Sequence, residues 1–227
     1  MINKIVQTMA DAMADIKDGS TVLLAGFGSV GQPNQLIDGL IEQGAKDLVV
    51  ACNNAGSGHT GLARLMELER VRKIICSFPR SSDPIVFETL YRAGKIELEI
   101  VPQGTIAERM RAAGAGIPQF FTATGVGTKM AVGKEHREIE GRTYILENAL
   151  KGDVGLVEAW EADRWGNLTY KLAGRNFNPV VAMAAKTTIV QTQHIRELGD
   201  IDPDHVVTPG IFVDRVLHVP YGDPGSF

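Results

Sequence analysis

The sequence predicts an α/β fold, an open three-layer arrangement with a mostly parallel sheet and helices on both faces. Short apolar runs rich in β-branched residues recur along the chain, as in strands that are buried on both faces of a parallel sheet. Each run ends in a glycine-rich or polar loop, and a stretch with helical spacing of apolar residues follows. Strand and helix units in series favour a Rossmann-like fold.

The N-terminal stretch, residues 2–17, predicts a first helix. It has neither a basic start nor an uninterrupted apolar stretch, so we do not expect a signal peptide. Nowhere do about 18 apolar residues run together, so no membrane-spanning helix and no membrane partner are expected. The residues at helical spacing are Ile5, Met9, Ala12, Met13 and Ile16.

The first strand and helix unit follows a turn at Asp18 and Gly19. A strand over 21–25 leads into the glycine loop 26–31, and a helix between Pro33 and Gly44 comes next.

The same unit then repeats, and the pattern loosens after residue 113. We expect further strands at 48–51, 73–76, 98–101, 143–146, 154–160 and 187–191. We expect further helices at 61–68, 84–93 and 106–113. Residues 114–152 are predicted as glycine-rich loops and short strands, and 202–219 as strand and loop.

Composition indicates one ordinary globular domain over residues 1–227. The 25 glycines and 10 prolines are spread along the chain and do not form a linker. The net charge of −4 comes from intermixed acidic and basic residues, so no nucleic-acid partner is expected. Cys52 and Cys76 lack CxxC spacing, which favours reduced core thiols and a cytoplasmic protein.

Ligands of open α/β sheets bind outside the carboxyl ends of the strands. The loops 26–31, 53–58, 77–83 and 102–105 should therefore converge on one crevice. These loops contain glycines, amides and one or two charges, with no cluster suited to proton transfer. The five histidines are scattered without metal-ligand spacing, so neither a metal nor a resident cofactor is predicted.

Gly26, Gly28 and Gly31 match the spacing of a dinucleotide-binding loop. The next strand ends in asparagines, however, where that site needs an acidic residue. A stand-alone Rossmann-type nucleotide-binding module and a simple tight turn both remain open. A serine nucleophile is not supported, because the spacing around Ser57 does not fit a nucleophile elbow.

Residues 18–33 resemble the glycine motif of family I coenzyme A transferases, although Ala25 stands where the family usually has glycine. Further stretches, in the family's order, are similar to its A subunit: 53–56, 101–109, 164–168 and 175–177. Within the family, residues 77–95 look closest to A subunits that act on 3-oxoadipate, and acetoacetate is the alternative.

The resemblance implies a ping-pong transfer of coenzyme A from succinyl-CoA to a 3-oxo acid, in which the coenzyme A thioester is a substrate. The nucleophilic glutamate would belong to a partner B subunit, in an A2B2 assembly. A coenzyme A hydrolase or a regulatory relative is a further alternative.

By the same resemblance, Gln103 would be an oxyanion donor on a turn that Gly104 helps to fix. The alternative is that Gln103 caps the following helix. The loop of Gly26, Phe27 and Gly28 would let backbone approach the thioester.

Three other side chains are candidates for substrate contacts. Asn53 and Asn54 would bind acyl or pantetheine amides, and local turn chemistry is the alternative. Arg80 is our hypothesis for the second carboxylate of a dicarboxylic substrate, and a solvated surface arginine is the alternative.

Overall fold

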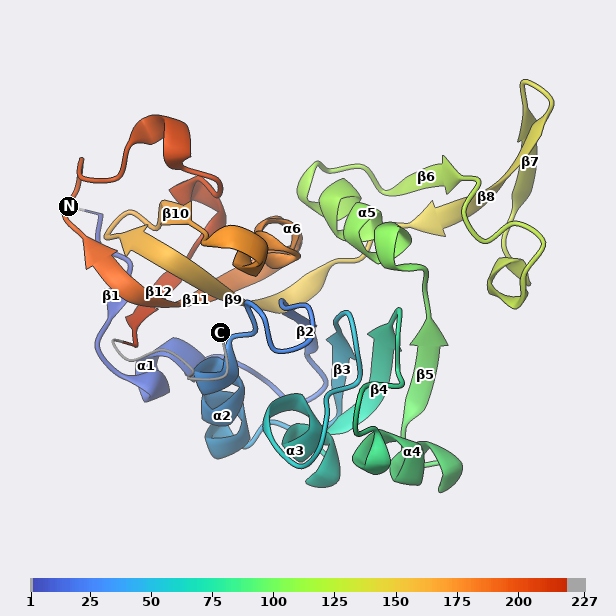
Figure 1. The fold of residues 1–227 in the computed structure, drawn as a ribbon, viewed down its shortest axis with the longest axis horizontal. Coiled ribbons are helices and arrows are strands. Elements are labelled where there is room, and N and C mark those ends of the chain that lie inside the picture. The colour runs from blue at the N-terminus through green and yellow to red at the C-terminus, as the bar shows by residue number, and fades with distance from the viewer. Residues whose placement is uncertain (1, 220–227) are drawn as a thin grey trace.

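The structure, a computed structural model, describes residues 2–219. Within them, nine strands form one sheet in the order β1-β12-β11-β9-β2-β3-β4-β5, with β10 beside β9 (Figure 1). Every pairing is parallel except that of β10 with β9, so the predicted, mostly parallel sheet is confirmed. The strands are β1 Ile5–Val6, β2 Thr21–Leu24, β3 Leu48–Ala51, β4 Val71–Cys76, β5 Glu97–Ile100, β9 Gly152–Asp163, β10 Leu168–Thr169, β11 Ala185–Arg196 and β12 Arg215–His218.

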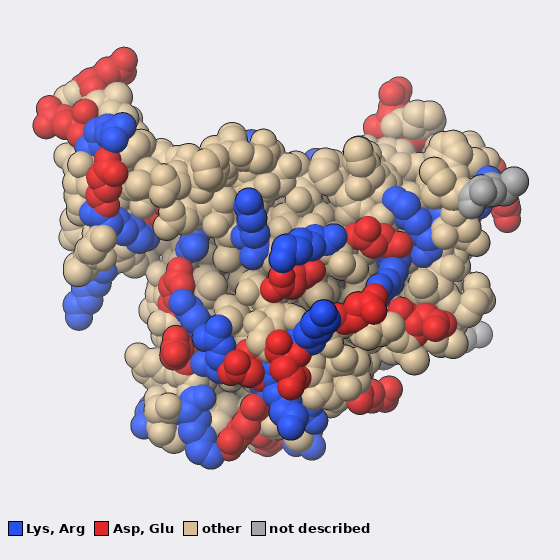
Figure 2. Space-filling view, turned by 180° about the vertical axis from the view of Figure 1, so that it is seen from behind, with Lys and Arg blue, Asp and Glu red and all other residues tan. Residues whose placement is uncertain are grey.

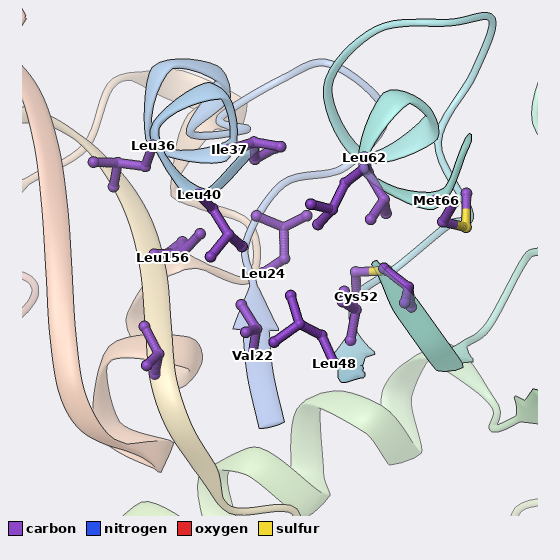
Figure 3. Packing of buried hydrophobic residues seen from close by; sticks show 14 of the residues in the cluster. Val22, Leu24, Leu36, Ile37, Leu40, Leu48, Cys52, Leu62, Met66 and Leu156 are labelled. Atoms are coloured by element: carbon purple, nitrogen blue, oxygen red, sulfur yellow. The ribbon is translucent and has the colours of Figure 1, made fainter. Parts of the chain in front are cut away.

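Helices cover both faces of this sheet (Figure 1). One face carries α1 Met9–Met13, α2 Asn34–Gln43, α3 Gly61–Glu67 and α4 Ile85–Arg92, and the other carries α5 Gln103–Gly114 and α6 Asn178–Ala184. Successive residues of a strand point to opposite faces, so Val22 and Leu24 pack into one core while Leu23 packs into the other. Figure 3 shows the first core, in which α2 and α3 side chains lie over β2 and β3.

Strands β2 to β5 are neighbours in sequence order. Because they are parallel, the loops that leave their carboxyl ends emerge at one edge of the sheet. Helix α2 ends where Gly44 takes a left-handed φ of 95° and its N–H donates to the Leu40 carbonyl over 3.2 Å.

The predicted first helix over 2–17 is wrong at its start. Ile5 and Val6 form an edge strand whose parallel partners are Val216 and Leu217. The helix begins only after Thr8, whose Oγ accepts the Asp11 N–H over 3.1 Å. Pairing with β12, distant in sequence, therefore outweighs the local helical spacing.

Residues 119–148 form an antiparallel arm that projects from the body (Figure 1). Its strands are β6 Gln119–Thr122, β7 His136–Ile139 and β8 Arg142–Asn148. The predicted strand 143–146 lies within β8, and the sequence pattern missed β6 and β7. Short 3₁₀ turns occupy Lys129–Ala131 (η1), Leu172–Arg175 (η2), Pro203–His205 (η3) and Gly210–Phe212 (η4).

The charged side chains are interspersed on the face that Figure 2 shows, with positive and negative groups side by side. Ion pairs join many of the protein's charged side chains, including Lys73 with Glu99 at 2.7 Å and Arg109 with Glu99 at 2.9 Å. Among residues 2–219, no helix combines the length and the apolar character needed to cross a membrane.

Candidate functional site

A pocket of about 1220 Å³ lies at the carboxyl edge of the sheet, lined by the loops after β2, β3 and β4 and by the start of α5. The predicted convergence of these loops is therefore confirmed. The loop and α5 residues that line it are Phe27, Gly28, Ser29, Gln32, Asn53, Asn54, Gly56, Ser57, Ser77, Phe78, Ser81, Ser82 and Gln103. Helices α2 and α3, with the residues just before α3, supply the remaining wall.

Gln103 lies in the first turn of α5, so this helix begins three residues earlier than the spacing predicted. Its Nε2 donates to Asn53 Oδ1 over 2.8 Å. No side chain caps α5, so the alternative of Gln103 as a helix cap does not describe its contact. A primary amide carries two N–H donors, and within residues 2–219 the nitrogen of Gln103 makes this one hydrogen bond, which leaves its second N–H available.

Asn53 makes several hydrogen bonds beside Gln103. It is buried, and its Oδ1 also accepts a hydrogen bond of 2.8 Å from Ser77 Oγ. Its carbonyl accepts the N–H groups of Ser77 and Phe78, which follow β4. Asn53 thus ties Gln103 to the loop of the neighbouring strand and fixes which way the Gln103 amide points.

Asn54 forms a local turn and also lines the pocket. Its Oδ1 accepts the Gly56 N–H over 2.9 Å, as in an Asx turn. Its carbonyl accepts a hydrogen bond of 2.7 Å from Cys52 Sγ. The turn chemistry considered for this asparagine is therefore present.

The glycine loop is a tight two-residue hairpin. Phe27 and Val30 exchange backbone hydrogen bonds of 3.0 and 3.2 Å, which leaves Gly28 and Ser29 at the tip. Gly26 and Gly28 have left-handed φ angles of 115° and 63°, so the predicted need for glycine in a tight turn is confirmed. Within residues 2–219, the N–H groups of Gly28 and Ser29 have no hydrogen-bond acceptor.

Ala25, where the family usually has glycine, does not face this pocket. It is buried in the core beneath α5 and α6, and its N–H donates to the Leu156 carbonyl over 3.1 Å. Its methyl group therefore adds apolar contact in the core.

Two asparagines that the sequence did not single out hold the glycine loop. Asn176 Oδ1 accepts the Gly26 N–H over 3.2 Å, and Asn178 Nδ2 donates to the Gly31 carbonyl over 3.0 Å. Asn176 lies within the stretch 175–177 that carries the family resemblance. That stretch was the only sequence feature that could have pointed to it.

Arg80 and Gly104 do not line the pocket. The Arg80 side chain is 77% exposed, and its Nε lies 3.1 Å from Glu88 Oε1 on α4. Gly104 is exposed in the first turn of α5, with open space where a Cβ would stand. The geometry of Arg80 is that of the solvated surface arginine considered above.

Among the described residues of the pocket wall, the ionisable side chains are few: Asp38 on α2, Arg64 on α3 and His59. Arg64 and His59 both contact Glu67, at 2.6 and 2.9 Å, and these contacts hold the pKa of Glu67 below its usual value. In the described part of the chain, no three histidine, cysteine or acidic side chains gather as metal ligands would. The pocket therefore offers amide and hydroxyl groups more than acids and bases.

Comparison with known sequences gives one family and a set of close relatives. The profile of the coenzyme A transferase family matches residues 6–218. The A subunit of 3-oxoadipate CoA-transferase from Pseudomonas putida is 58% identical over 219 residues, which is 96% of this chain and 95% of that one. The protein of the same name from Acinetobacter baylyi is 53% identical, with 96% of each chain covered. The A subunit of a probable succinyl-CoA:3-ketoacid coenzyme A transferase from Bacillus subtilis is 48% identical, over 95% of this chain and 90% of that one.

Solved structures share the fold. An acyl-CoA transferase from Escherichia coli O157:H7, in a thioester complex with CoA, aligns with a TM-score of 0.83 at 20% identity and covers 98% of this chain. This chain spans 48% of that protein's length. Glutaconate coenzyme A-transferase from Acidaminococcus fermentans also has a TM-score of 0.83, at 23% identity, with 96% of this chain and 76% of that one covered. At such identities the likeness supports the α/β fold and no more.

Proposed function

This chain belongs to the coenzyme A transferase family, and we propose that it is the A subunit of an enzyme that moves coenzyme A from succinyl-CoA to 3-oxoadipate. The choice of 3-oxoadipate rests on one observation. Two A subunits named for 3-oxoadipate are 58% and 53% identical to this chain over nearly the whole length of each. The relative named for 3-ketoacids is less similar, at 48%, so acetoacetate is the second candidate acceptor.

We further propose that the nucleophile is a glutamate of the B subunit. Its carboxylate attacks the thioester carbonyl of succinyl-CoA to form a tetrahedral adduct. This adduct expels coenzyme A as the thiolate and leaves a mixed anhydride of the glutamate and succinate. The thiolate then attacks the glutamyl carbonyl and displaces succinate, which leaves a glutamyl-CoA thioester. The carboxylate of the 3-oxo acid reverses these steps and regenerates the glutamate.

The groups that line this chain's pocket support a nucleophile on the B subunit and hydrogen-bond donors on this chain. Each step passes through a tetrahedral oxyanion, which needs preorganised neutral donors. The second N–H of Gln103 and the free N–H groups at the tip of the glycine loop are donors of that kind. Among the described residues that line the pocket, Asp38 is the one carboxylate.

Trapping of the thioester tests where the nucleophile lies. Co-purified A and B subunits are treated with succinyl-CoA and then with borohydride, and the reduced residue is mapped by mass spectrometry. We expect the label on one glutamate of the B subunit, both in the wild type and in the Asp38→Asn variant. A label on this chain, at Asp38 or elsewhere, refutes the proposal.

The choice of acceptor is tested by kcat/KM for 3-oxoadipate and for acetoacetate with the same complex. We expect 3-oxoadipate to be preferred. Assays without any acceptor acid measure hydrolysis, and we expect free coenzyme A to form much more slowly than 3-oxoadipyl-CoA. Rapid hydrolysis without an acceptor would instead favour the hydrolase alternative.

We propose an A2B2 assembly in the cytoplasm, without a resident cofactor. The unpaired and buried thiols Cys52 and Cys76 support a reducing compartment. The relatives are named as A subunits, which supports a B partner. Native mass spectrometry of the co-purified complex gives the stoichiometry directly.

A further inference from the structure

The conformation of the glycine-loop tip depends on contacts with other parts of the chain. Its two bridging residues, Phe27 and Val30, are exposed, and their mutual hydrogen bonds are the backbone contacts that close the hairpin within residues 2–219. Gly26, Gly28 and Gly31 all take left-handed φ angles, and glycine is the residue with the greatest conformational freedom. Such a loop does not fix the direction of the Gly28 and Ser29 N–H groups by itself.

Asn176 holds both ends of this hairpin. Its Oδ1 accepts the Gly26 N–H over 3.2 Å, and its Nδ2 donates to the Val30 carbonyl over 3.0 Å. The same side chain is fixed in its own segment, because Nδ2 also donates to the Ala173 carbonyl over 2.8 Å and Oδ1 accepts the Phe177 N–H over 2.6 Å. One amide therefore joins the segment before α6 to a loop about 150 residues earlier.

Asn178 makes a second link between the segment before α6 and the glycine loop. It is fully buried, and its Nδ2 donates to the carbonyls of Gly31 and Gly174 over 3.0 and 2.8 Å. Its Oδ1 accepts the Glu158 N–H of β9 over 2.8 Å, so this link is also bonded to the sheet. Asn178 is thus part of the folded core, whereas Asn176 is only partly buried and lies beside the hairpin.

We propose that Asn176 is a positioning residue for the transfer reaction: it presets the hairpin 27–30 so that its tip donors face the reacting carbonyl. This inference rests on the proposed function, because it assigns the loop to the oxyanion. Preorganised donors act on the transition state, so loss of Asn176 lowers kcat and leaves KM nearly unchanged.

Two variants and two measurements test this, with the A and B polypeptides co-purified. Asn176→Ala removes every contact of the amide, and Asn176→Asp keeps the acceptor for Gly26 but cannot donate to Val30. Asn148→Ala is the matched control, since Asn148 is an exposed asparagine of the arm whose Oδ1 accepts from Gln119. The measurements are steady-state kinetics and hydrogen–deuterium exchange of the peptide that covers residues 25–32.

We expect Asn176→Ala to lower kcat at least tenfold, to change KM less than threefold and to speed exchange in residues 25–32, with a smaller effect for Asn176→Asp and none for Asn148→Ala. Faster exchange with an unchanged kcat would overturn the positioning role. Unchanged exchange would overturn the claim that Asn176 holds the loop. If the wild-type complex transfers no coenzyme A to 3-oxo acids, the proposed function fails, and exchange still decides whether Asn176 holds the loop.

Discussion

Gln103 and Asn53 are 50 residues apart in the sequence, yet their side-chain amides are joined by a hydrogen bond. Burial of Asn53 and its second hydrogen bond, from Ser77, keep the Asn53 oxygen in place, so the Gln103 nitrogen is held beside Asn53 in the wall of the pocket. A donor that is held in this way suits a developing negative charge, which is the role we propose for Gln103.

Replacement of Gln103 by alanine should therefore slow transfer without preventing assembly. Loss of one oxyanion donor costs about 2.7 to 4 kcal/mol, so kcat of the A and B complex should fall by about 10²- to 10³-fold. Gln119→Ala is the control, because Gln119 makes an equivalent amide contact, 2.8 Å from Asn148 Oδ1, in the arm. Turnover that is the same in Gln103→Ala and wild type removes Gln103 from the reaction.

The two cysteines should be unreactive in the folded protein. Burial raises the pKa of the Cys76 thiol to about 12, and burial also raises the pKa of Cys52. The thiolate is the reactive form, and at about pH 8 both groups stay protonated. We expect no reaction with an aromatic disulfide reagent in native protein and two equivalents after unfolding. Rapid modification of native protein would show that β3 and β4 open readily.

The position of Arg80 predicts that it does not select the substrate. Its guanidinium pairs with Glu88 outside the pocket, so Arg80→Ala should leave the ratio of kcat/KM for 3-oxoadipate and acetoacetate unchanged. An exposed ion pair of this kind contributes about 0 to 1 kcal/mol, so the melting temperature should also change little. A selective loss of 3-oxoadipate activity would restore the role that the sequence suggested.

At the scale of elements, the contact between the glycine loop and the segment before α6 can be tested by paired glycine substitutions. Gly28 and Gly31 share a φ of 63°. A Cβ at Gly31 would stand 2.6 Å from the Gly174 carbonyl oxygen and 2.8 Å from Asn176 Nδ2, whereas a Cβ at Gly28 would meet nothing within 4 Å.

Both alanine variants therefore bear the same cost of a left-handed residue, about 1 to 2 kcal/mol. Gly31→Ala should be the less stable of the two in denaturant titrations, because its Cβ also pushes the two segments apart. Equal free energies of unfolding would mean that the loop and the segment before α6 separate at little cost.

The sequence predicted the repeating core well, because strands buried on both faces carry unbroken apolar runs. The strand predicted at 48–51 matches β3, and 73–76 lies within β4. The errors fall where distant contacts decide the structure. Ile5 joins an edge strand with β12 in place of the predicted helix. Strands β6 and β7 are short, with β6 half-buried and β7 exposed, and neither has an alternating apolar pattern.

The site was predictable to the extent that it follows from sheet topology. Loops after successive parallel strands must meet at one edge, so Asn53 and Gln103 could be brought together in advance. The contacts of Asn176 could not be predicted, because no local sequence pattern identifies an asparagine that bonds to a loop about 150 residues away. The direction of the Arg80 side chain was not predictable either, because a sequence position next to a site does not fix where a long side chain points.

For the whole molecule, two large apolar side chains lie among polar ones at the rim of the pocket. Phe27 and Phe78 line it with 51% and 59% of their surface exposed, and Val30 is also exposed beside them. Large exposed apolar side chains around a polar pocket are typical of an interaction surface. If the B subunit covers this rim, it excludes water from the pocket and brings the nucleophile to the donors of this chain.

The isolated chain should therefore be inactive and prone to self-association, and the B subunit should reverse both properties. Titration of the B subunit into this chain should raise transferase activity until the two are equimolar. It should also raise the melting temperature of this chain, because a partner that binds only the folded state stabilises it by mass action. Sedimentation velocity of this chain alone and of the mixture measures the association state in parallel. Coenzyme A transfer by the purified chain, at the rate of the complex, would mean that it carries its own nucleophile.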